Sequence, residues 1–460
     1  MRDSLAWLDA SLHARGFSDT RARHCADVFR ECDQTLSAMG AGVLGRHAFW
    51  VPGRLEMFGK HTDYAGGRSL LAAVERGFCM RAAPRGDPVV RVRTSDGSMT
   101  CELALATSAN APDGHWSNYV ATVARRVALN FPDVATGVDI VFSSDLPLAA
   151  GVSSSTALMI GVFMAIAAVN RLSDSDAWQA SLPTREDLAG YLGAMEMGGA
   201  FGALQGLDGV RTLGGSQDQT AILCAEPERV VDFAWMPVRR VGAYPLPAAY
   251  RFVIAASGVI AEKSAGARDR YNRASLMVRH LLASWNASTG RTDHSLAAAA
   301  ECSPSAHDAL REMIPRMATE SFRADALRQR LDQFLLETYT LIPAAANALM
   351  AQDWPSLGDV AERSQHAAEE WLGNQIPETK RLVRLARDQG AIAASAFGAG
   401  FGGSVWALVP AAEADAPGGA FNARWQEAYR REFPQHASVA MFFSTAAGPA
   451  AMHWHDETGR

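Results

Sequence analysis

The chain has 460 residues, of which 48% are hydrophobic and 20% charged, as in an ordinary soluble globular protein. That length is enough for two or three domain-sized units, or for two lobes that share a cleft. The 43 basic and 49 acidic residues give a net charge of −6. This balance argues against nucleic acid as the main partner, because binding to a phosphate backbone needs a basic surface.

The cysteines and apolar runs indicate where such a protein works. Six scattered cysteines without a CxxC pair favour buried thiols over a zinc site or a disulfide framework. Residues 1–17 contain no uninterrupted apolar core of signal-peptide length. The longest apolar run, Ala157–Val169, is too short to span a bilayer and predicts a buried helix. We expect a cytoplasmic protein without a membrane partner, either a monomer or a weak homo-oligomer.

The first half of the chain mixes helical and strand patterns. Residues 1–45 have the pattern of an amphipathic helical lead-in, and the short alternating runs of residues 47–107 predict strands. Another alternating run, 138–142, leads into a Gly-Ser loop and the buried helix. Thr184, with Asp187 three residues later, predicts a helix that begins with a capping box.

The second half is more helical. Prolines between residues 225 and 247 mark the start of a second unit, and a strand is expected over 251–259. Residues 263–390 are mostly helical by their apolar period, and strands return at 404–409 and 439–443. The pattern predicts an α+β protein of two lobes with a cleft between them.

The loop Gly151-Val152-Ser153-Ser154-Ser155 lies between a predicted strand and the buried helix. Free N–H groups and the positive dipole end at a helix start form an anion site. Gly151 lets the backbone approach phosphates, and the serine hydroxyls can donate to them or bind Mg²⁺. The loop is neither a Walker A motif nor a dinucleotide fingerprint. By itself it could also be an ordinary serine cap on a core helix.

This loop is the second of three motifs in the chain. The first is Gly53–Tyr64 (GRLEMFGKHTDY), and the third is Gly398–Ser404 (GAGFGGS). In this order and at these separations they resemble the three motifs of the GHMP small-molecule kinases, most of all the galactokinase branch. The segment 215–219 (GSQDQ) stands where that family has its catalytic aspartate, and the resemblance extends over roughly residues 45–450.

The resemblance implies a two-lobed GHMP kinase fold with the active site in the cleft between the lobes. The expected units are a helical lead-in at 1–45, an N-terminal ATP-binding lobe at 46–225 and a C-terminal lobe at 226–460. It also implies an ATP-dependent sugar 1-kinase, which transfers the γ-phosphoryl group of ATP to the anomeric hydroxyl of a monosaccharide with Mg²⁺ as cofactor. Galactose is the expected acceptor.

Roles of individual residues follow from the same resemblance. Asp218 faces the anomeric hydroxyl and accepts or orients its proton, and Arg54 keeps Asp218 ionised and stabilises the transferring phosphoryl group. Ser155 and Glu196 match the positions that hold Mg²⁺. The expected sugar pocket consists of Lys60, His61, Asp63, Gly215 and Tyr271. The expected ATP site consists of Gly151, Val152, Ser153, Ser154, Ser155, Gly400 and Gly402.

The first motif departs from the galactokinase pattern at two positions, where Glu56 replaces the usual Asn and Lys60 replaces the usual Glu. That glutamate accepts a hydrogen bond from the sugar 6-hydroxyl in galactokinases, whereas a lysine only donates and suits a carboxylate better. Three interpretations stay open. They are a local charge exchange between Glu56 and Lys60 with galactose kept, a uronic acid or other C6-modified sugar, and a pentose or unrelated substrate.

Before the third motif, Ser395-Ala396-Phe397 stands where galactokinases carry an Arg-Met-Thr type sequence, so a basic side chain near the phosphates is missing. Two further function classes remain. One is a sugar sensor with the kinase fold and no turnover, and the retained serines, Arg54 and Asp218 argue against it. The other is a kinase for a non-sugar acceptor, as in mevalonate or homoserine kinases, and the polar His61–Tyr64 segment argues against that.

Overall fold

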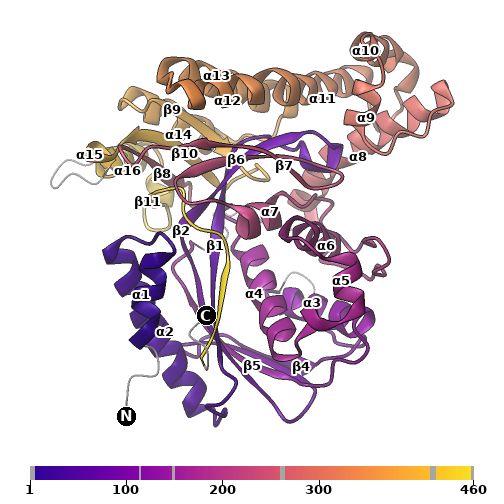
Figure 1. Cartoon of the computed structure of the whole chain (residues 1–460). Coiled ribbons are helices and arrows are strands. Elements are labelled where there is room, and N and C mark those ends of the chain that lie inside the picture. Colours follow the sequence, from indigo (N-terminus) through magenta and orange to yellow (C-terminus); the bar gives the residue numbers. More distant parts are fainter. Residues whose placement is uncertain (1–5, 113–114, 148–150, 260–264, 415–420, 457–460) are drawn as a thin grey trace.

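The computed structural model describes residues 6–112, 115–147, 151–259, 265–414 and 421–456. Two β-sheets form the centres of two α+β layers (Figure 1). The first sheet has eight strands in the order β12-β1-β2-β5-β3-β4, with β6 paired to β2 and β7 paired to β6. Its strands are β1 (His47–Phe58), β2 (Arg68–Pro84), β3 (Val89–Thr94), β4 (Thr100–Ala104), β5 (Val138–Ser144), β6 (Arg229–Ala234), β7 (Arg239–Pro245) and β12 (Met452–His455).

The second sheet has four strands in the order β11-β8-β10-β9, all antiparallel. Its strands are β8 (Tyr250–Ala256), β9 (Ala393–Phe397), β10 (Ser404–Pro410) and β11 (Met441–Thr445). Strands β8, β9 and β10 are mostly buried, because helices pack against the sheet. The strands expected from the sequence at 251–259, 404–409 and 439–443 correspond to β8, β10 and β11.

Helices cover both faces of the first sheet. The hairpin of α1 (Ala6–Ala14) and α2 (Asp19–Ala38) lies on one side of β1 and β2, and the buried helix α4 (Ser154–Val169) lies on the other (Figure 1). The predicted lead-in is therefore a cover for this sheet. Behind α4 stand α3 (Ser117–Asn130), α5 (Asp176–Ser181), α6 (Arg185–Met197) and α7 (Gln217–Cys224). The predicted capping box of Thr184 and Asp187 begins α6 and is confirmed.

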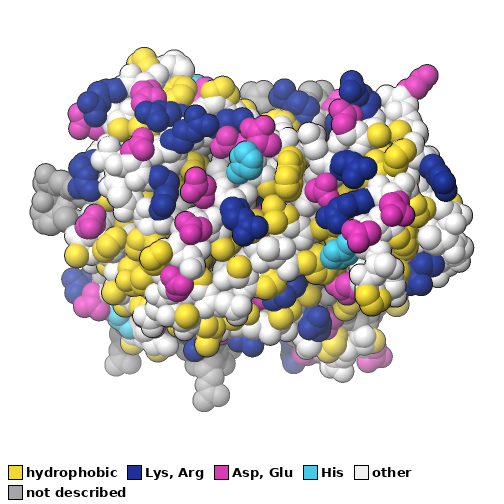
Figure 2. Space-filling view, turned by 90° about the horizontal axis from the view of Figure 1, so that it is seen from above, with side chains coloured by type: hydrophobic (Ala, Val, Ile, Leu, Met, Phe, Trp, Pro, Cys, Tyr) yellow, Lys and Arg dark blue, Asp and Glu magenta, His cyan; other side chains and the backbone are white. Residues whose placement is uncertain are grey.

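The long helical stretch predicted over 263–390 is confirmed for its described part, since residues 263 and 264 lie outside it. It forms α8 (Ala265–Thr289), α9 (Leu296–Glu301), α10 (Ala306–Met317), α11 (Ala324–Leu336), α12 (Ile342–Ala351), α13 (Trp354–Ala367) and α14 (Pro377–Asp388). Two short helices follow, α15 (Ala411–Ala414) and α16 (Phe421–Glu432). Figure 2 shows basic and acidic side chains interspersed over one face of the molecule, with no large patch of a single sign.

The sheets divide the chain differently from the predicted lobe boundary at 225/226. Strands β6, β7 and β12 come after that boundary, yet they belong to the first sheet. β6 pairs antiparallel with the start of β2, and β12 pairs with the start of β1. The reason is that the open edges of β1 and β2 are covered by segments from the second half of the chain. A strand pattern alone does not say which sheet a strand joins.

One continuous helical stretch of the described chain, Ala324–Ala351, is long and apolar enough by composition to cross a membrane. In its most apolar window, 56% of the residues are buried inside the molecule. It packs against neighbouring helices, which is typical of a core helix in a soluble protein.

Candidate active site

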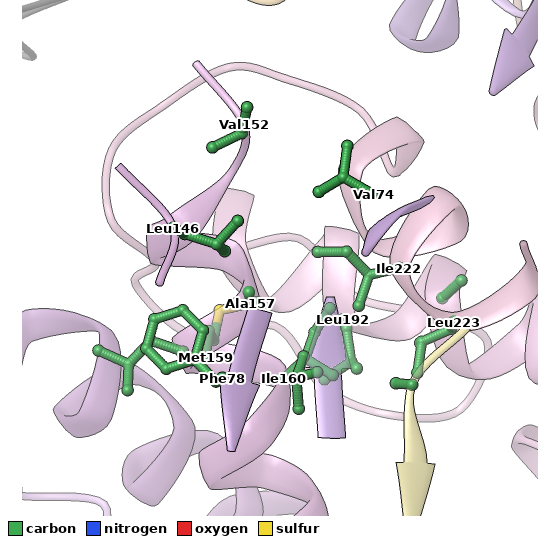
Figure 3. Close-up of a cluster of buried hydrophobic side chains, with 14 of the residues drawn as sticks. Val74, Phe78, Leu146, Val152, Ala157, Met159, Ile160, Leu192, Ile222 and Leu223 are labelled. Carbon is green, nitrogen blue, oxygen red and sulfur yellow. The ribbon is translucent and has the colours of Figure 1, made fainter. Parts of the chain in front are cut away.

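The first motif enters the site on β1. Arg54 and Glu56 stand two residues apart on one strand, so their side chains point to the same face, and both line a cleft. Gly53 lies against the opposite wall. A Cβ atom there would lie 2.7 Å from a Leu146 methyl and 2.9 Å from the Val152 carbonyl oxygen, so only glycine fits. Figure 3 shows Leu146 and Val152 in the apolar cluster that fixes this wall.

Asp218 is held on both sides by the other motifs. It is the second residue of α7, and its Oδ1 accepts a hydrogen bond of 2.6 Å from Arg54 Nε. Its Oδ2 accepts one of 2.5 Å from Ser153 Oγ. A further N–H of Arg54 donates to the Gly151 carbonyl at 2.6 Å. Burial by itself would lower the pKa of the Arg54 guanidinium, but the Asp218 and Glu56 carboxylates raise it overall, so Arg54 stays charged.

The phosphate-loop residues lie at the start of α4. Gly151 and Ser153 have φ of 72° and 61°, in the left-handed region, and the helix begins at Ser154. Gly151, Ser153, Ser154 and Ser155 line the cleft, beside the free N–H groups of the first helical turn. Val152 does not line it. Its side chain is fully buried, and its carbonyl accepts a hydrogen bond from the Arg54 N–H, so it anchors the loop.

The third motif closes the opposite wall. Gly398, Ala399, Gly400 and Phe401 line the cleft, whereas the predicted Gly402 lies outside the lining. A Cβ atom at Gly400 would lie 2.4 Å from the Asn374 carbonyl oxygen. The close approach explains the glycine there, because a side chain would push this loop out of place.

Ser155 and Glu196 line the same cleft as Asp218. Glu196, near the end of α6, accepts hydrogen bonds at one oxygen from Thr156 Oγ1 at 3.1 Å and Gln219 Nε2 at 2.6 Å. A hydroxyl and a carboxylate are oxygen ligands that suit Mg²⁺. No group of three or more His, Cys, Asp or Glu is arranged to hold a metal in the described parts of the chain. A Mg²⁺ ion here would need phosphate oxygens and water to complete its ligands.

Asp63, Gly215 and Tyr271 meet on the other side of Asp218 and also line the cleft. The Gln217 N–H donates to Asp63 Oδ2 at 3.3 Å, and a Cβ atom at Gly215 would lie 2.3 Å from that oxygen. Glycine at 215 therefore leaves room for the carboxylate. Burial raises the pKa of Asp63 to about 6 and that of the Tyr271 hydroxyl well above its usual value.

His61 joins the first and third motifs. Its Nε2 lies 3.2 Å from the Ala399 carbonyl, which can only accept, so we assign the hydrogen to Nε2. Its Nδ1 lies 2.7 Å from the Tyr64 hydroxyl. Burial, followed by the nearby Arg330 charge, lowers the pKa of His61 to about 3, so the ring is neutral. His61 lines the cleft, but protein groups use both ring nitrogens.

Lys60 does not lie where the sequence predicted. Its side chain is 1% exposed and does not line the cleft. The ammonium donates to Ser364 Oγ at 2.7 Å and to Ser395 Oγ at 2.9 Å. Ser364 in turn donates to both oxygens of the buried Glu337. The lysine is therefore the nearby cation that offsets Glu337, through Ser364, and it contacts neither Glu56 nor the cleft directly.

This network connects two of the departures from the galactokinase pattern, at Lys60 and at Ser395. The basic side chain that the family carries at position 395 is replaced here by a serine, and Lys60 brings a basic group to that serine. Glu337 also accepts a hydrogen bond of 2.8 Å from the Gly59 N–H. No motif marks Glu337, which lies 278 residues from Gly59, so no local pattern could have predicted its role.

Glu56 is a cleft residue that the sequence motifs did not place in the site. It is 3% exposed, and one of its oxygens accepts hydrogen bonds from Gln217 Nε2 at 2.6 Å and the Gly398 N–H at 3.2 Å. Burial raises its pKa to about 7, against the opposite effects of Arg54 and Lys60. Its two-residue spacing from Arg54 was the signal that could have placed it on the same face.

Known protein families match three segments of the chain. Residues 42–84 match the galactokinase galactose-binding signature, residues 118–208 the GHMP kinases N terminal domain, and residues 345–426 the GHMP kinases C terminal domain. In this order, the three segments contain the first, the second and the third motif. They come from both halves of the chain.

Similar proteins agree with these matches. The galactokinase of Glaesserella parasuis serovar 5 is 25% identical over 384 residues, which cover 83% of this chain and 89% of the relative. The galactokinase of Haemophilus influenzae is 33% identical over 113 residues, 25% of this chain and 29% of that one.

Solved structures share the fold. The galactokinase of Lactococcus lactis, solved with galactose, aligns with a TM-score of 0.71 and 21% identity over 92% of this chain and 98% of that one. The mevalonate kinase of L. major aligns with a TM-score of 0.52 and 14% identity, over 89% of this chain and 99% of that one. The family matches, the relatives and the fold agree: the chain belongs to the GHMP kinases and is a galactokinase-like sugar kinase.

Proposed function

We propose that this kinase transfers the γ-phosphoryl group of ATP to the anomeric hydroxyl of galactose. The observation that carries the proposal is the position of Asp218, held by Arg54 and Ser153 in a cleft between the phosphate loop and the His61–Asp63 segment. The galactose-binding signature at residues 42–84 and the galactokinase relatives support galactose as the acceptor.

In this reaction the sugar hydroxyl lies against the Asp218 carboxylate. The carboxylate orients the hydroxyl and takes its proton as the new oxygen–phosphorus bond forms. The bond between the γ-phosphorus and the bridging oxygen breaks, and ADP leaves with the electron pair. Because the transition state is loose, positioning and positive charge matter more than covalent catalysis. Arg54 supplies that charge, and the α4 N-terminus supplies N–H donors for the phosphates.

Ser155 and Glu196 are the residues that would hold Mg²⁺, and the bound ion would neutralise charge on the phosphates. Thr156 and Gln219 donate to the same oxygen of Glu196, and they orient its carboxylate. Ser154 and the Gly400 segment line the remaining wall, where the triphosphate would lie. We also propose that the enzyme is cytoplasmic and works as a monomer or weak homo-oligomer.

The position of Lys60 favours a neutral sugar over a uronic acid. A carboxylate at C6 would need a cation in the sugar pocket, but the Lys60 ammonium is buried against Ser364 and Ser395. Glu56 brings a carboxylate to the cleft instead. A sensor without turnover is disfavoured, because the Arg54–Asp218–Ser153 arrangement is complete.

The test is an ATP-consumption assay with galactose, N-acetylgalactosamine, glucose, arabinose, galacturonate and glucuronate. We expect the highest kcat/KM with galactose. A maximum with a uronate would overturn the assigned acceptor and keep the kinase mechanism. Sugar-dependent thermal stabilisation without any ATP consumption would replace the enzyme with a sensor.

A further inference from the structure

Glu56 has one carboxylate oxygen that the protein leaves without a partner. The side chain is 3% exposed and lines the cleft, and its Oε1 is buried with no hydrogen-bond partner among the described residues. A buried carboxylate oxygen without a donor is costly, and such groups in native structures call for an explanation. The cleft that this residue lines is the place where a ligand can supply the donor.

The other oxygen is fixed, and this sets the direction of Oε1. Gln217 Nε2 and the Gly398 N–H both donate to Oε2. The amide of Gln217 cannot turn over freely, because Ser69 Oγ donates to its Oε1 at 3.0 Å. Ser69 Oγ in turn accepts from Trp235 Nε1 at 3.1 Å. This chain of donors holds the carboxylate in one orientation, so Oε1 is preorganised to accept a hydrogen bond.

The charges around Glu56 restrict what the ligand can be. Arg54 lies near it, but the Nε of Arg54 is used by Asp218 and another N–H is used by the Gly151 carbonyl. When Glu56 is ionised, a phosphate oxygen is repelled by its charge and has no proton to donate to it. A carboxylate on the acceptor sugar meets the same repulsion. A neutral hydroxyl is a donor that fits both limits.

We propose that Glu56 Oε1 accepts a hydrogen bond from a hydroxyl of the sugar other than the one that is phosphorylated, and that it selects neutral over anionic acceptors. The inference rests on the proposed sugar kinase function. It gives this chain a specificity-determining carboxylate at position 56, in a motif where the acid of the family pattern stands at position 60. The carboxylate that accepts a hydrogen bond from the sugar thereby lies at position 56 instead of position 60. Lys60 belongs to the buried network around Glu337.

The variant Glu56→Gln tests the proposal sharply. Gln217 Nε2 and the Gly398 N–H are both donors, so the carbonyl oxygen of the new amide must face them. Its NH₂ group then occupies the position of Oε1, and an acceptor becomes a donor without a change in size. We expect galactose binding, measured by calorimetry without ATP, to weaken by about 10-fold or more, as for the loss of a hydrogen bond to a charged group.

Monodeoxygalactoses identify the hydroxyl. In the unmodified protein, one deoxy sugar should bind about 10-fold or more weaker than galactose, and in Glu56→Gln the same sugar should lose nothing further, because the partners form one interaction. The ratio of galacturonate to galactose binding should rise in the variant. Equal losses for every deoxy sugar in both proteins would overturn the proposal. So would unchanged sugar binding with a raised Mg²⁺ requirement, which would make Glu56 a metal ligand.

Glu337→Gln is the matched control, because Glu337 is a buried glutamate, 1% exposed, that does not line the cleft. It should change thermal stability and leave the pattern of deoxy-sugar binding as it is. The binding measurement also separates the two proposals. If the unmodified protein binds galactose with the predicted deoxy pattern but consumes no ATP, the kinase function fails and the role of Glu56 stands. If ATP is consumed but the pattern is absent, only the role of Glu56 fails.

Discussion

The cleft and the terminal seam bury polar groups in opposite ways. The terminal seam is the region where β12 pairs with β1 beneath α2. There, the fully buried Arg81 donates to Asp33 and twice to Asp456, at 2.5 to 2.9 Å. In the cleft, Glu56 Oε1 and Gln219 Oε1 have no partner among the described residues. The Arg81 cluster of the seam is paired within the protein, whereas these two cleft oxygens receive no donor from the described chain.

Burial also shifts proton affinity in opposite directions in these two regions. In the cleft it raises the pKa of Glu56 to about 7 and that of Asp63 to about 6. In the seam it lowers the pKa of His47 to about 3 and that of His453 to about 4, with further lowering by neighbouring histidines. In each case burial disfavours the charged form. Changes in the cleft should therefore alter activity, and changes in the seam should alter stability.

The largest expected effect belongs to the cleft. Asp218→Asn should lower kcat by about 10³-fold, because the amide cannot take the proton of the sugar hydroxyl. ATP binding and the thermal midpoint should change little, since Asn can still accept from Arg54. Steady-state kinetics and nucleotide titration measure both. Near-normal turnover would remove Asp218 from the mechanism.

In the seam, Arg81→Met should destabilise the fold by about 3–5 kcal/mol, because it leaves buried carboxylates without their cation. Chemical denaturation measures the loss, and kcat per folded molecule should stay the same. Arg30→Met, at the exposed pair of Arg30 with Asp27, is the control and should cost about 0–1 kcal/mol. A large fall in kcat for fully folded Arg81→Met would contradict a purely structural role for Arg81.

Variants of Lys60 test whether this residue selects the sugar, as its place in the motif suggests, or stabilises the fold, as its buried contacts suggest. Lys60→Met should lower stability by about 2 kcal/mol, because Ser364 and Ser395 lose a buried donor and Glu337 loses the nearby charge. The order of preference among sugars should not change. A change in the preference for uronates would show that Lys60 takes part in sugar recognition.

The smallest effect is a pH dependence. The pKa of His47 is lower in the folded chain, so below pH 6.5 the unfolded chain binds a proton that the folded chain does not, and stability falls as pH falls towards 3. Glu56 and Asp63 act in the opposite sense, because their raised pKa values favour proton uptake by the folded chain. Between pH 7 and pH 5.5, the free energy of unfolding should therefore fall by about 1 kcal/mol less in His47→Gln than in the unmodified chain. Parallel denaturation curves at both pH values measure it, and an unchanged difference would contradict it.

The sequence predicted the parts of the site that lie in short motifs. Arg54, Asp218 and the serines at 153–155 could be found because a glycine turn or a helix start marks each of them. Residues whose role depends on a distant partner could not. Lys60 is the example, since its position is decided by Ser364, Ser395 and, beyond Ser364, Glu337.

The fold shows the same division. The helix of 154–169 and the capped helix of 185–197 were predictable from local patterns, because apolar period and capping are local properties. The assignment of β6, β7 and β12 to the first sheet was not. Pairing between strands that are far apart in sequence depends on which sheet edge is open, and a single strand pattern does not contain that information.

The pairing of β12 with β1 has a consequence for synthesis of the protein. His47 lies opposite His455, so the strand that presents Arg54 and Glu56 has an open edge until the end of the chain has been made. At translation rates of roughly 5–20 residues per second, that wait lasts on the order of 20–80 s. During this time β1 is an exposed edge that other chains can pair with. A nascent chain that stalls before residue 452 therefore leaves the ribosome as a candidate for chaperones or proteases.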